Sequence, residues 1–138
     1  MTETTCRLCN PMRAEAVLWR DRSCRVIDVG DRDYPGYCHV IWNAHVREMS
    51  DLTAESRTHL LAVVCGVEQV LRHLLHSDKI NLASLGNQVP HLHWHVIPRF
   101  ADDPHFPDSI WAARKRAANP RPVDRAALIR ELARLLPH

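Results

Sequence analysis

The sequence predicts an α+β protein in which an antiparallel sheet of about five strands is packed by one long helix, with a further helix at the C-terminus. Three observations predict this class. Short apolar segments are separated by turn residues, one long segment has helical periodicity, and strands are expected on both sides of that segment along the chain. The 138 residues, of which 46% are hydrophobic, are enough for one domain with a hydrophobic core.

The first strands are expected at 16–19 and 24–29, on either side of a polar turn at 20–23. A loop at 30–36 contains the dipeptide Pro-Gly, which is typical of a turn, and leads into a strand at 38–42. Because the first two strands are joined by a short turn, we expect them to pair antiparallel.

The clearest helix is expected at 53–76. Thr53 is a suitable N-cap, and Glu55 lies near the positive end of the helix dipole. Apolar residues recur at three- and four-residue steps and form one stripe: Leu60, Val63, Val64, Val67, Val70, Leu71, Leu74 and Leu75. Such a stripe must be buried, and the sheet is its expected partner.

Two more strands are expected at 79–83 and 92–97. The segment 98–123 is rich in Pro, Asp and Arg and is expected to wrap the surface. A last helix is expected at 124–136, because its first residue is an aspartate suited to an N-cap and leucines follow at helical spacing.

The charge distribution argues against two classes of partner. The net charge is +2, but residues 1–110 carry 11 Lys or Arg and 14 Asp or Glu, whereas residues 111–138 carry 7 and 2. A slightly acidic body does not suit a protein that coats nucleic acid. No apolar run approaches the roughly 18–20 residues of a membrane span, so we expect neither a nucleic-acid nor a membrane partner.

The chain contains five cysteines. An odd number, together with a polar N-terminal segment that does not resemble an export signal, favours a reducing, cytoplasmic location. Cys6 and Cys9 form a Cys-x-x-Cys motif, which by itself is compatible with half of a zinc site, a redox pair or chance spacing.

Three of the ten histidines lie within five positions, at His91, His93 and His95. In a strand, alternate side chains share a face, so these imidazoles are expected on one side at steps of about 6.6 Å, with the apolar residues between them facing the core. The alternatives are an exposed polar face, a three-histidine metal site, or a histidine nucleophile beside a histidine acid or base, as in phosphoryl or nucleotidyl transfer.

The loop before the histidines favours the third alternative. Its residues Gly86, Asn87 and Gln88 offer backbone N–H groups and side-chain amides. Such neutral donors can hold phosphate oxygens and the charge that develops on them during transfer.

The segment HLHWHVIPR at 91–99 resembles the signature of the histidine triad (HIT) family of nucleotide hydrolases and transferases. PGYCHVIWNAH at 35–45 and SDLT at 50–53 resemble further family segments, and the run at 79–111 is similar to a bacterial subgroup described as diadenosine polyphosphate hydrolase-like. The resemblance covers roughly residues 6–112. It implies a HIT domain at 1–112, followed by a basic extension with a helix at 113–138.

The resemblance implies a catalytic role for each histidine of the triad. His93 would be the nucleophile that attacks the α-phosphorus of a nucleotide, and water would then release a nucleoside monophosphate from the covalent nucleotidyl-histidine. His95 would hydrogen-bond phosphate or the leaving group, and His91 would orient His93. This scheme requires no catalytic cofactor.

The resemblance also implies contacts with the substrate. The residues concerned are Asn81, Asn87, Gln88, Asp28 and Trp111. Asp31 is an alternative to Asp28 on the ribose side. Tyr37 departs from the family pattern, because most members have a histidine there. His39 is expected to be a packed residue rather than a ligand.

The resemblance gives the Cys-x-x-Cys motif a specific interpretation. Some HIT proteins bind a structural zinc, and Cys6, Cys9, His45 and His91 occupy the corresponding positions here. The family also implies a homodimer with one continuous sheet and a small-molecule nucleotide as ligand. A three-histidine zinc hydrolase and a nucleotide sensor without turnover remain alternative functions.

Overall fold

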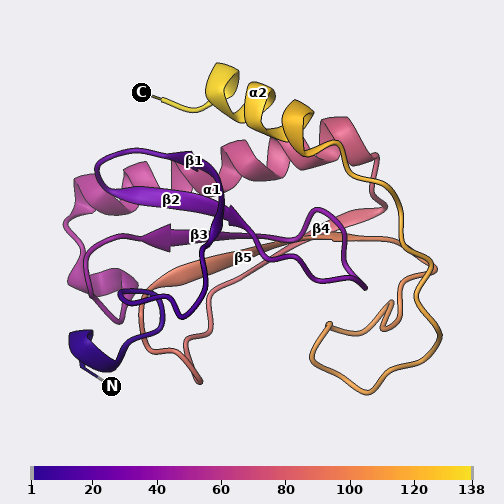
Figure 1. Ribbon diagram of the computed structural model, residues 1–138, viewed down its shortest axis with the longest axis horizontal. Helices are drawn as coiled ribbons and strands as arrows, with labels where there is room; N and C mark the ends of the chain where they lie inside the picture. Colours follow the sequence, from indigo (N-terminus) through magenta and orange to yellow (C-terminus); the bar gives the residue numbers. More distant parts are fainter. Residues whose placement is uncertain (1, 138) are drawn as a thin grey trace.

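A five-stranded antiparallel sheet forms the centre of the protein, and both α-helices lie over one of its faces (Figure 1). The computed structural model describes residues 2–137. Its strand order is β1-β2-β3-β5-β4. The strands are β1 (Ala16–Arg20), β2 (Cys24–Asp28), β3 (Cys38–Trp42), β4 (Lys79–Ala83) and β5 (His93–Arg99). The helices are α1 (Ala54–Leu75) and α2 (Arg125–Leu135), with short 3-10 helices η1 (Glu3–Thr5) and η2 (Met49–Asp51). The predicted α+β class is therefore confirmed.

The long helix α1 begins and ends where the sequence predicts. The Thr53 side chain accepts a hydrogen bond from the Ser56 N–H at 3.1 Å, so one of the free N–H groups of the first turn has a partner. At the other end, His76 adopts a left-handed conformation with φ of 50°, which terminates the helix. The apolar stripe between them packs against the sheet.

The sheet has two chemically different faces. On β3 and β5 the residues Val40, Trp94 and Val96 point toward the helices, whereas alternate residues point the other way. The antiparallel register pairs His39 with His95 and Ile41 with His93. The histidines of both strands therefore lie on the face that the helices leave open.

β5 starts and ends later than expected. It begins at His93 rather than 92 and continues through Pro98 to Arg99. Its last pair with β3 is Val96 with Cys38, whereas β4 pairs as far as Arg99. Beyond Val96 the strand has one neighbour, so the missing N–H of Pro98 removes no hydrogen bond to β3.

The C-terminal helix α2 joins the same core as α1 and the sheet. Leu128, Leu132 and Leu136 are buried there, and α2 contacts both α1 and β1. Gly66 on α1 provides the space that Leu136 fills, since a Cβ at this position would overlap its side chain. Within residues 2–137, neither helix combines the length and apolar character that crossing a bilayer requires.

Candidate functional site

A cavity of about 810 Å³ opens on the sheet face that carries the histidines. His39, His93 and His95 contribute from the strands, and Gly86, Asn87 and Gln88 from the loop between β4 and β5. The remaining wall includes Asp31, Tyr34, Tyr37, His105, Ile110 and Trp111. The structure thus brings together five of the sequence-predicted site residues: His93, His95, Asn87, Gln88 and Trp111.

The protonation of His93 follows from one hydrogen bond. Its Nδ1 lies 2.6 Å from the backbone oxygen of His91. A carbonyl oxygen only accepts, so Nδ1 carries a proton, and in the neutral imidazole Nε2 therefore has the free lone pair. His93 lines the cavity, although only 7% of its surface is exposed. A nitrogen with a free lone pair in such a place can act as nucleophile, base or metal ligand.

His95 is held by Tyr37 and His39. The Tyr37 hydroxyl lies 2.5 Å from His95 Nδ1 and 3.3 Å from His39 Nε2, and these two nitrogens are 3.1 Å apart. Burial raises the pKa of Tyr37, so its hydroxyl keeps its proton. Burial, with a smaller effect of His93, lowers the pKa of His95 to about 4.

These values determine how the protons are arranged. Burial and the neighbouring histidines lower the pKa of His39 to about 3, so both imidazoles are neutral near pH 7. In the tautomer of His95 that carries the proton on Nε2, the Tyr37 hydroxyl donates to His95 Nδ1. His39 Nε2–H can in turn donate to the Tyr37 oxygen. In this tautomer His95 Nε2–H is a hydrogen-bond donor, in contrast to the Nε2 of a neutral His93.

His39 and Tyr37 are the functional residues that sequence reasoning missed. His39 is partly buried, as expected, but it also lines the cavity and contacts His95. Its position in the sequence carries a usable signal. It alternates with Cys38 and Val40, which belong to the core, so it must occupy the opposite face of β3.

His91 does not share a site with the other two histidines, contrary to the expected row of three. It precedes β5, and its side chain turns toward Cys6, Cys9 and His45. Its Nδ1 lies 3.4 Å from both sulfur atoms and 3.1 Å from His45 Nδ1, while Cys9 Sγ is 3.4 Å from His45 Nδ1. Its Nε2 donates to the Trp42 carbonyl at 2.5 Å, which leaves Nδ1 free for the cluster.

This cluster has the chemistry and spacing of a zinc site. Around a tetrahedral zinc, with Zn–N of about 2.0 Å and Zn–S of about 2.3 Å, the N···N and S···N edges are about 3.3–3.5 Å. The observed separations of 3.1 and 3.4 Å lie close to these values. Two thiols and two imidazoles are a common structural zinc set, so the residues present fit the metal.

Asp28 and Asn81 do not line the cavity. Asp28 follows Cys24 and Val26 on the helix-facing side of β2, and its carboxylate pairs with Arg125 at 2.6 Å. Asn81 accepts a hydrogen bond from Arg99 at 2.7 Å. Of the two ribose-side candidates, Asp31 is the one that lines the cavity.

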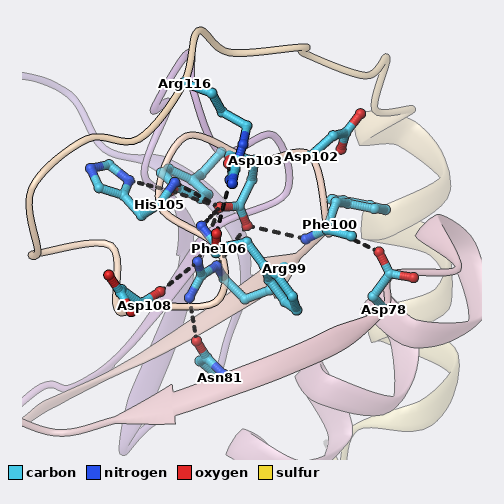
Figure 2. A network of polar contacts seen from close by, with 12 residues as sticks. Asp78, Asn81, Arg99, Phe100, Asp102, Asp103, His105, Phe106, Asp108 and Arg116 are labelled. Carbon is cyan, nitrogen blue, oxygen red and sulfur yellow. Dashed lines mark hydrogen bonds and ion pairs between the residues drawn. The ribbon is translucent and has the colours of Figure 1, made fainter.

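Arg99 and Asp103 form the centre of a network of polar contacts within the loop after β5 (Figure 2). This loop contributes His105, Ile110 and Trp111 to the cavity wall. Both are buried, and Arg99 donates to the carboxylate through Nε at 2.7 Å and Nη2 at 3.0 Å. The carboxylate also accepts the backbone N–H groups of Phe100, His105 and Phe106. The same loop carries Trp111, whose ring centroid is 5.1 Å from that of His95. Arg99 thus pairs with Asp103 and does not line the cavity.

We expect Asp103→Asn to lower the free energy of unfolding by about 3–5 kcal/mol, because it leaves the buried Arg99 without its counter-charge. Urea unfolding measures this loss. Asp102→Asn is the matched control, since Asp102 is more exposed and its pair with Arg121 contributes at most about 1 kcal/mol. An equal loss in both variants would contradict the buried role of Asp103.

The Arg99–Asp103 pair also makes the free energy of unfolding depend on pH, with stability falling as the pH is lowered. Burial alone would raise the pKa of Asp103, but Arg99 and the backbone N–H groups bring it down from 3.8 to about 2. A carboxyl group with a lower pKa in the folded state adds stability above the unfolded value. That contribution is lost as the pH falls from about 4 toward 2. Unfolding measured across this range should therefore show a smaller slope for Asp103→Asn than for the wild type.

Comparison with known proteins agrees with this site. Residues 12–102 match the HIT domain family. The asymmetrical bis(5'-nucleosyl)-tetraphosphatase of Schizosaccharomyces pombe is 34% identical over 70 residues, which are 47% of this chain and 38% of that protein. The chain therefore matches well under half the length of this curated relative.

Solved structures of histidine triad proteins have the same fold. One from Sinorhizobium meliloti is 27% identical, with a TM-score of 0.73 over 98% of this chain and 100% of that chain. A zinc-bound histidine triad family protein from Mycobacterium smegmatis is 23% identical, with a TM-score of 0.69 over 97% of each chain. The family match spans most of the chain and includes the histidines of the cavity, so this protein belongs to the HIT, or histidine triad, family.

Proposed function

We propose that the protein is a nucleotide hydrolase that cleaves a phosphoanhydride or phosphoramidate bond and releases a nucleoside monophosphate. The observation that carries this proposal is the hydrogen bond from His93 Nδ1 to the His91 carbonyl, which leaves Nε2 unprotonated in a nucleotide-sized cavity. The S. pombe relative is named as a tetraphosphatase, an enzyme that cleaves phosphoanhydride bonds, which is the same class of reaction.

The first step forms a bond between His93 Nε2 and the α-phosphorus, while the bond from phosphorus to the leaving group breaks. Donors from Asn87 and Gln88, both in the cavity wall, would hold the phosphate oxygens as charge develops on them. His95 Nε2–H would donate to phosphate or to the leaving group. A phosphate leaving group departs as an anion, so a neutral His95 suffices for it, whereas the amine of a phosphoramidate takes a proton from solvent as the P–N bond breaks.

In the second step, water attacks the phosphorus and the N–P bond breaks. The monophosphate leaves, a proton of the water passes to solvent, and His93 regains its lone pair. Throughout both steps the His91 carbonyl retains the Nδ1 proton and so fixes the orientation of the ring.

Chromatography of the products tests the proposed reaction. The protein should release AMP from diadenosine tetraphosphate or from adenosine 5'-phosphoramidate. If it bound AMP in calorimetry but released none from either compound, a nucleotide sensor would replace the hydrolase as the better account.

We expect Tyr37→Phe to lower kcat about 10-fold with little change in KM, since the His95 proton would no longer be fixed on Nε2 and one hydrogen bond is worth about 1.4 kcal/mol. Steady-state kinetics measures kcat and KM separately, and thermal unfolding verifies that the variant is folded. An unchanged kcat would show that the hydroxyl does not position His95.

We also propose that Cys6, Cys9, His45 and His91 hold a structural zinc. The cluster joins the N-terminal segment to His91, two positions before the strand that carries His93. Zinc bound by such a closed set contributes folding free energy and leaves no open coordination position for chemistry. The zinc-bound M. smegmatis protein has the same fold.

A homodimer is the quaternary structure we propose. β4 has one strand neighbour, β5, and Leu82 on β4 is 39% exposed, so a second copy can extend the sheet at this edge. We expect light scattering to give twice the mass of the 15.9 kDa chain. Leu82→Lys should shift the protein toward monomer, and a monomeric wild type would contradict the proposal.

A further inference from the structure

His39 places a third imidazole beside the two histidines of the proposed reaction. One nitrogen from each of His39, His93 and His95 lies within 4.8 Å of the nitrogens of the other two. We propose that these three residues form a second metal site, for a divalent transition metal such as Zn²⁺, Co²⁺ or Ni²⁺, and that metal bound there blocks nucleotide hydrolysis. The inhibitory part rests on the proposed function, whereas the binding part does not.

The three rings converge rather than stack. Their centroids are 5.2 Å apart for His39 and His93, 5.0 Å for His93 and His95, and 4.6 Å for His39 and His95. The interplanar angles lie between 58° and 87°, so the rings are not stacked, and one nitrogen of each ring lies within 4.8 Å of the other two. His39 Nε2 and His95 Nδ1 are 3.1 Å apart, the same separation as the His45 and His91 nitrogens of the zinc cluster.

The nitrogens also have the electronic state that a metal requires. His93 Nε2 has a free lone pair because Nδ1 donates to the His91 carbonyl. His39 and His95 are neutral imidazoles near pH 7, since burial lowers the pKa of each. His39 Nε2 would bind a metal in the tautomer that carries the proton on Nδ1, so its hydrogen bond to the Tyr37 oxygen would be given up. A metal on His95 Nδ1 would take the place of the hydrogen bond between this nitrogen and the Tyr37 hydroxyl, which lies 2.5 Å away.

The donor set determines which cations can bind. Imidazole suits zinc, cobalt, nickel and copper, whereas magnesium and calcium require oxygen ligands. The cavity lined by these histidines gives ions access from solvent. Metal held by His93 would occupy the lone pair that the proposed attack uses, so metal and nucleotide should compete.

The two metal sites should therefore have opposite effects. The Cys₂His₂ cluster contains thiolates and is expected to stabilise the fold, whereas the His₃ cluster has nitrogen donors and is expected to inhibit turnover. Cobalt distinguishes the two, because thiolate ligands give it a charge-transfer absorption that imidazoles do not.

The test titrates zinc-loaded protein with Co²⁺ and records the visible spectrum. We expect a second equivalent with nitrogen-ligand bands, without thiolate charge transfer, which AMP displaces. His39→Asn should raise the Co²⁺ Kd of this site at least about 10-fold, as losses at metal sites commonly do. His73→Asn is the matched control, because His73 is an exposed histidine on α1 and belongs to none of the candidate metal-ligand clusters within residues 2–137.

Cys6→Ser separates the two sites further, since it should weaken the thiolate site and keep the second. The proposal is overturned if cobalt binds only with thiolate bands, or if His39→Asn leaves the Kd unchanged. Metal bound at the three histidines without loss of turnover would overturn the inhibitory part. Metal binding in a protein that hydrolyses no nucleotide would support the site and contradict the proposed function.

Discussion

His93→Ala should lower kcat/KM for nucleotide hydrolysis by on the order of 10⁴-fold, because the variant lacks the atom that forms the N–P bond. The fold should persist, since His93 lies on the cavity face and its ring belongs to neither apolar core cluster. Product release measured at saturating and limiting substrate gives both kinetic constants. Nucleotide binding should change far less than turnover.

His73→Ala is the matched control for this loss. His73 is an exposed histidine on α1, and the core of the protein separates it from the cavity. It should retain wild-type turnover. If His93→Ala turned over within about tenfold of the wild type, His93 could not be the nucleophile, and a water activated by another group would have to replace it.

Cys6→Ser is expected to lose the structural zinc and to lower the free energy of unfolding by at least about 3 kcal/mol, or roughly 10 °C in Tm. Cys6 is fully buried and contacts His91, so a serine there leaves an incomplete ligand set in the interior. Elemental analysis measures the zinc per chain, and thermal scans with and without chelator measure its contribution.

The control for the zinc site is Cys65→Ser, which removes an exposed thiol on α1. A chelator should lower the Tm of this variant and of the wild type, but should change that of Cys6→Ser little. Full zinc content in Cys6→Ser would contradict the proposed ligands. Loss of activity on chelation without any loss of stability would instead favour a zinc hydrolase.

The two clusters meet at a single residue. The His91 imidazole belongs to the Cys₂His₂ cluster, and the His91 carbonyl accepts the hydrogen bond from His93 Nδ1. Loss of zinc would therefore free the segment that fixes the orientation of the nucleophile. In the proposed mechanism, His91 would position His93 through its carbonyl, although its own ring points to the other cluster.

Elements defined by local patterns could be predicted closely from the sequence. The Thr53 cap and the leucine and valine stripe place α1 to within one residue at each end. The same holds for α2, because the Asp124 side chain caps it by accepting from the Ala127 N–H. Alternation along 91–97 correctly placed His93 and His95 opposite the core.

Features that depend on strand pairing could not be predicted in this way. His39 comes next to His95 only through the register of β3 with β5, which joins segments 56 residues apart. Asp28 faces α2 because alternate residues of β2 point toward the helices, and it pairs with Arg125. Asn81 accepts a hydrogen bond from Arg99 on the neighbouring strand. Such contacts depend on strand register and tertiary structure, which local sequence propensity does not predict.

The most direct test of the account is to trap the intermediate. Rapid acid-free quenching of a reaction with α-phosphate-labelled nucleotide should yield one labelled peptide, with an acid-labile bond at His93, formed and consumed at rates consistent with kcat. His93→Ala should give no label. A labelled adduct in His93→Ala with normal turnover, or full turnover of the wild type without any adduct, would contradict nucleotidyl transfer to His93.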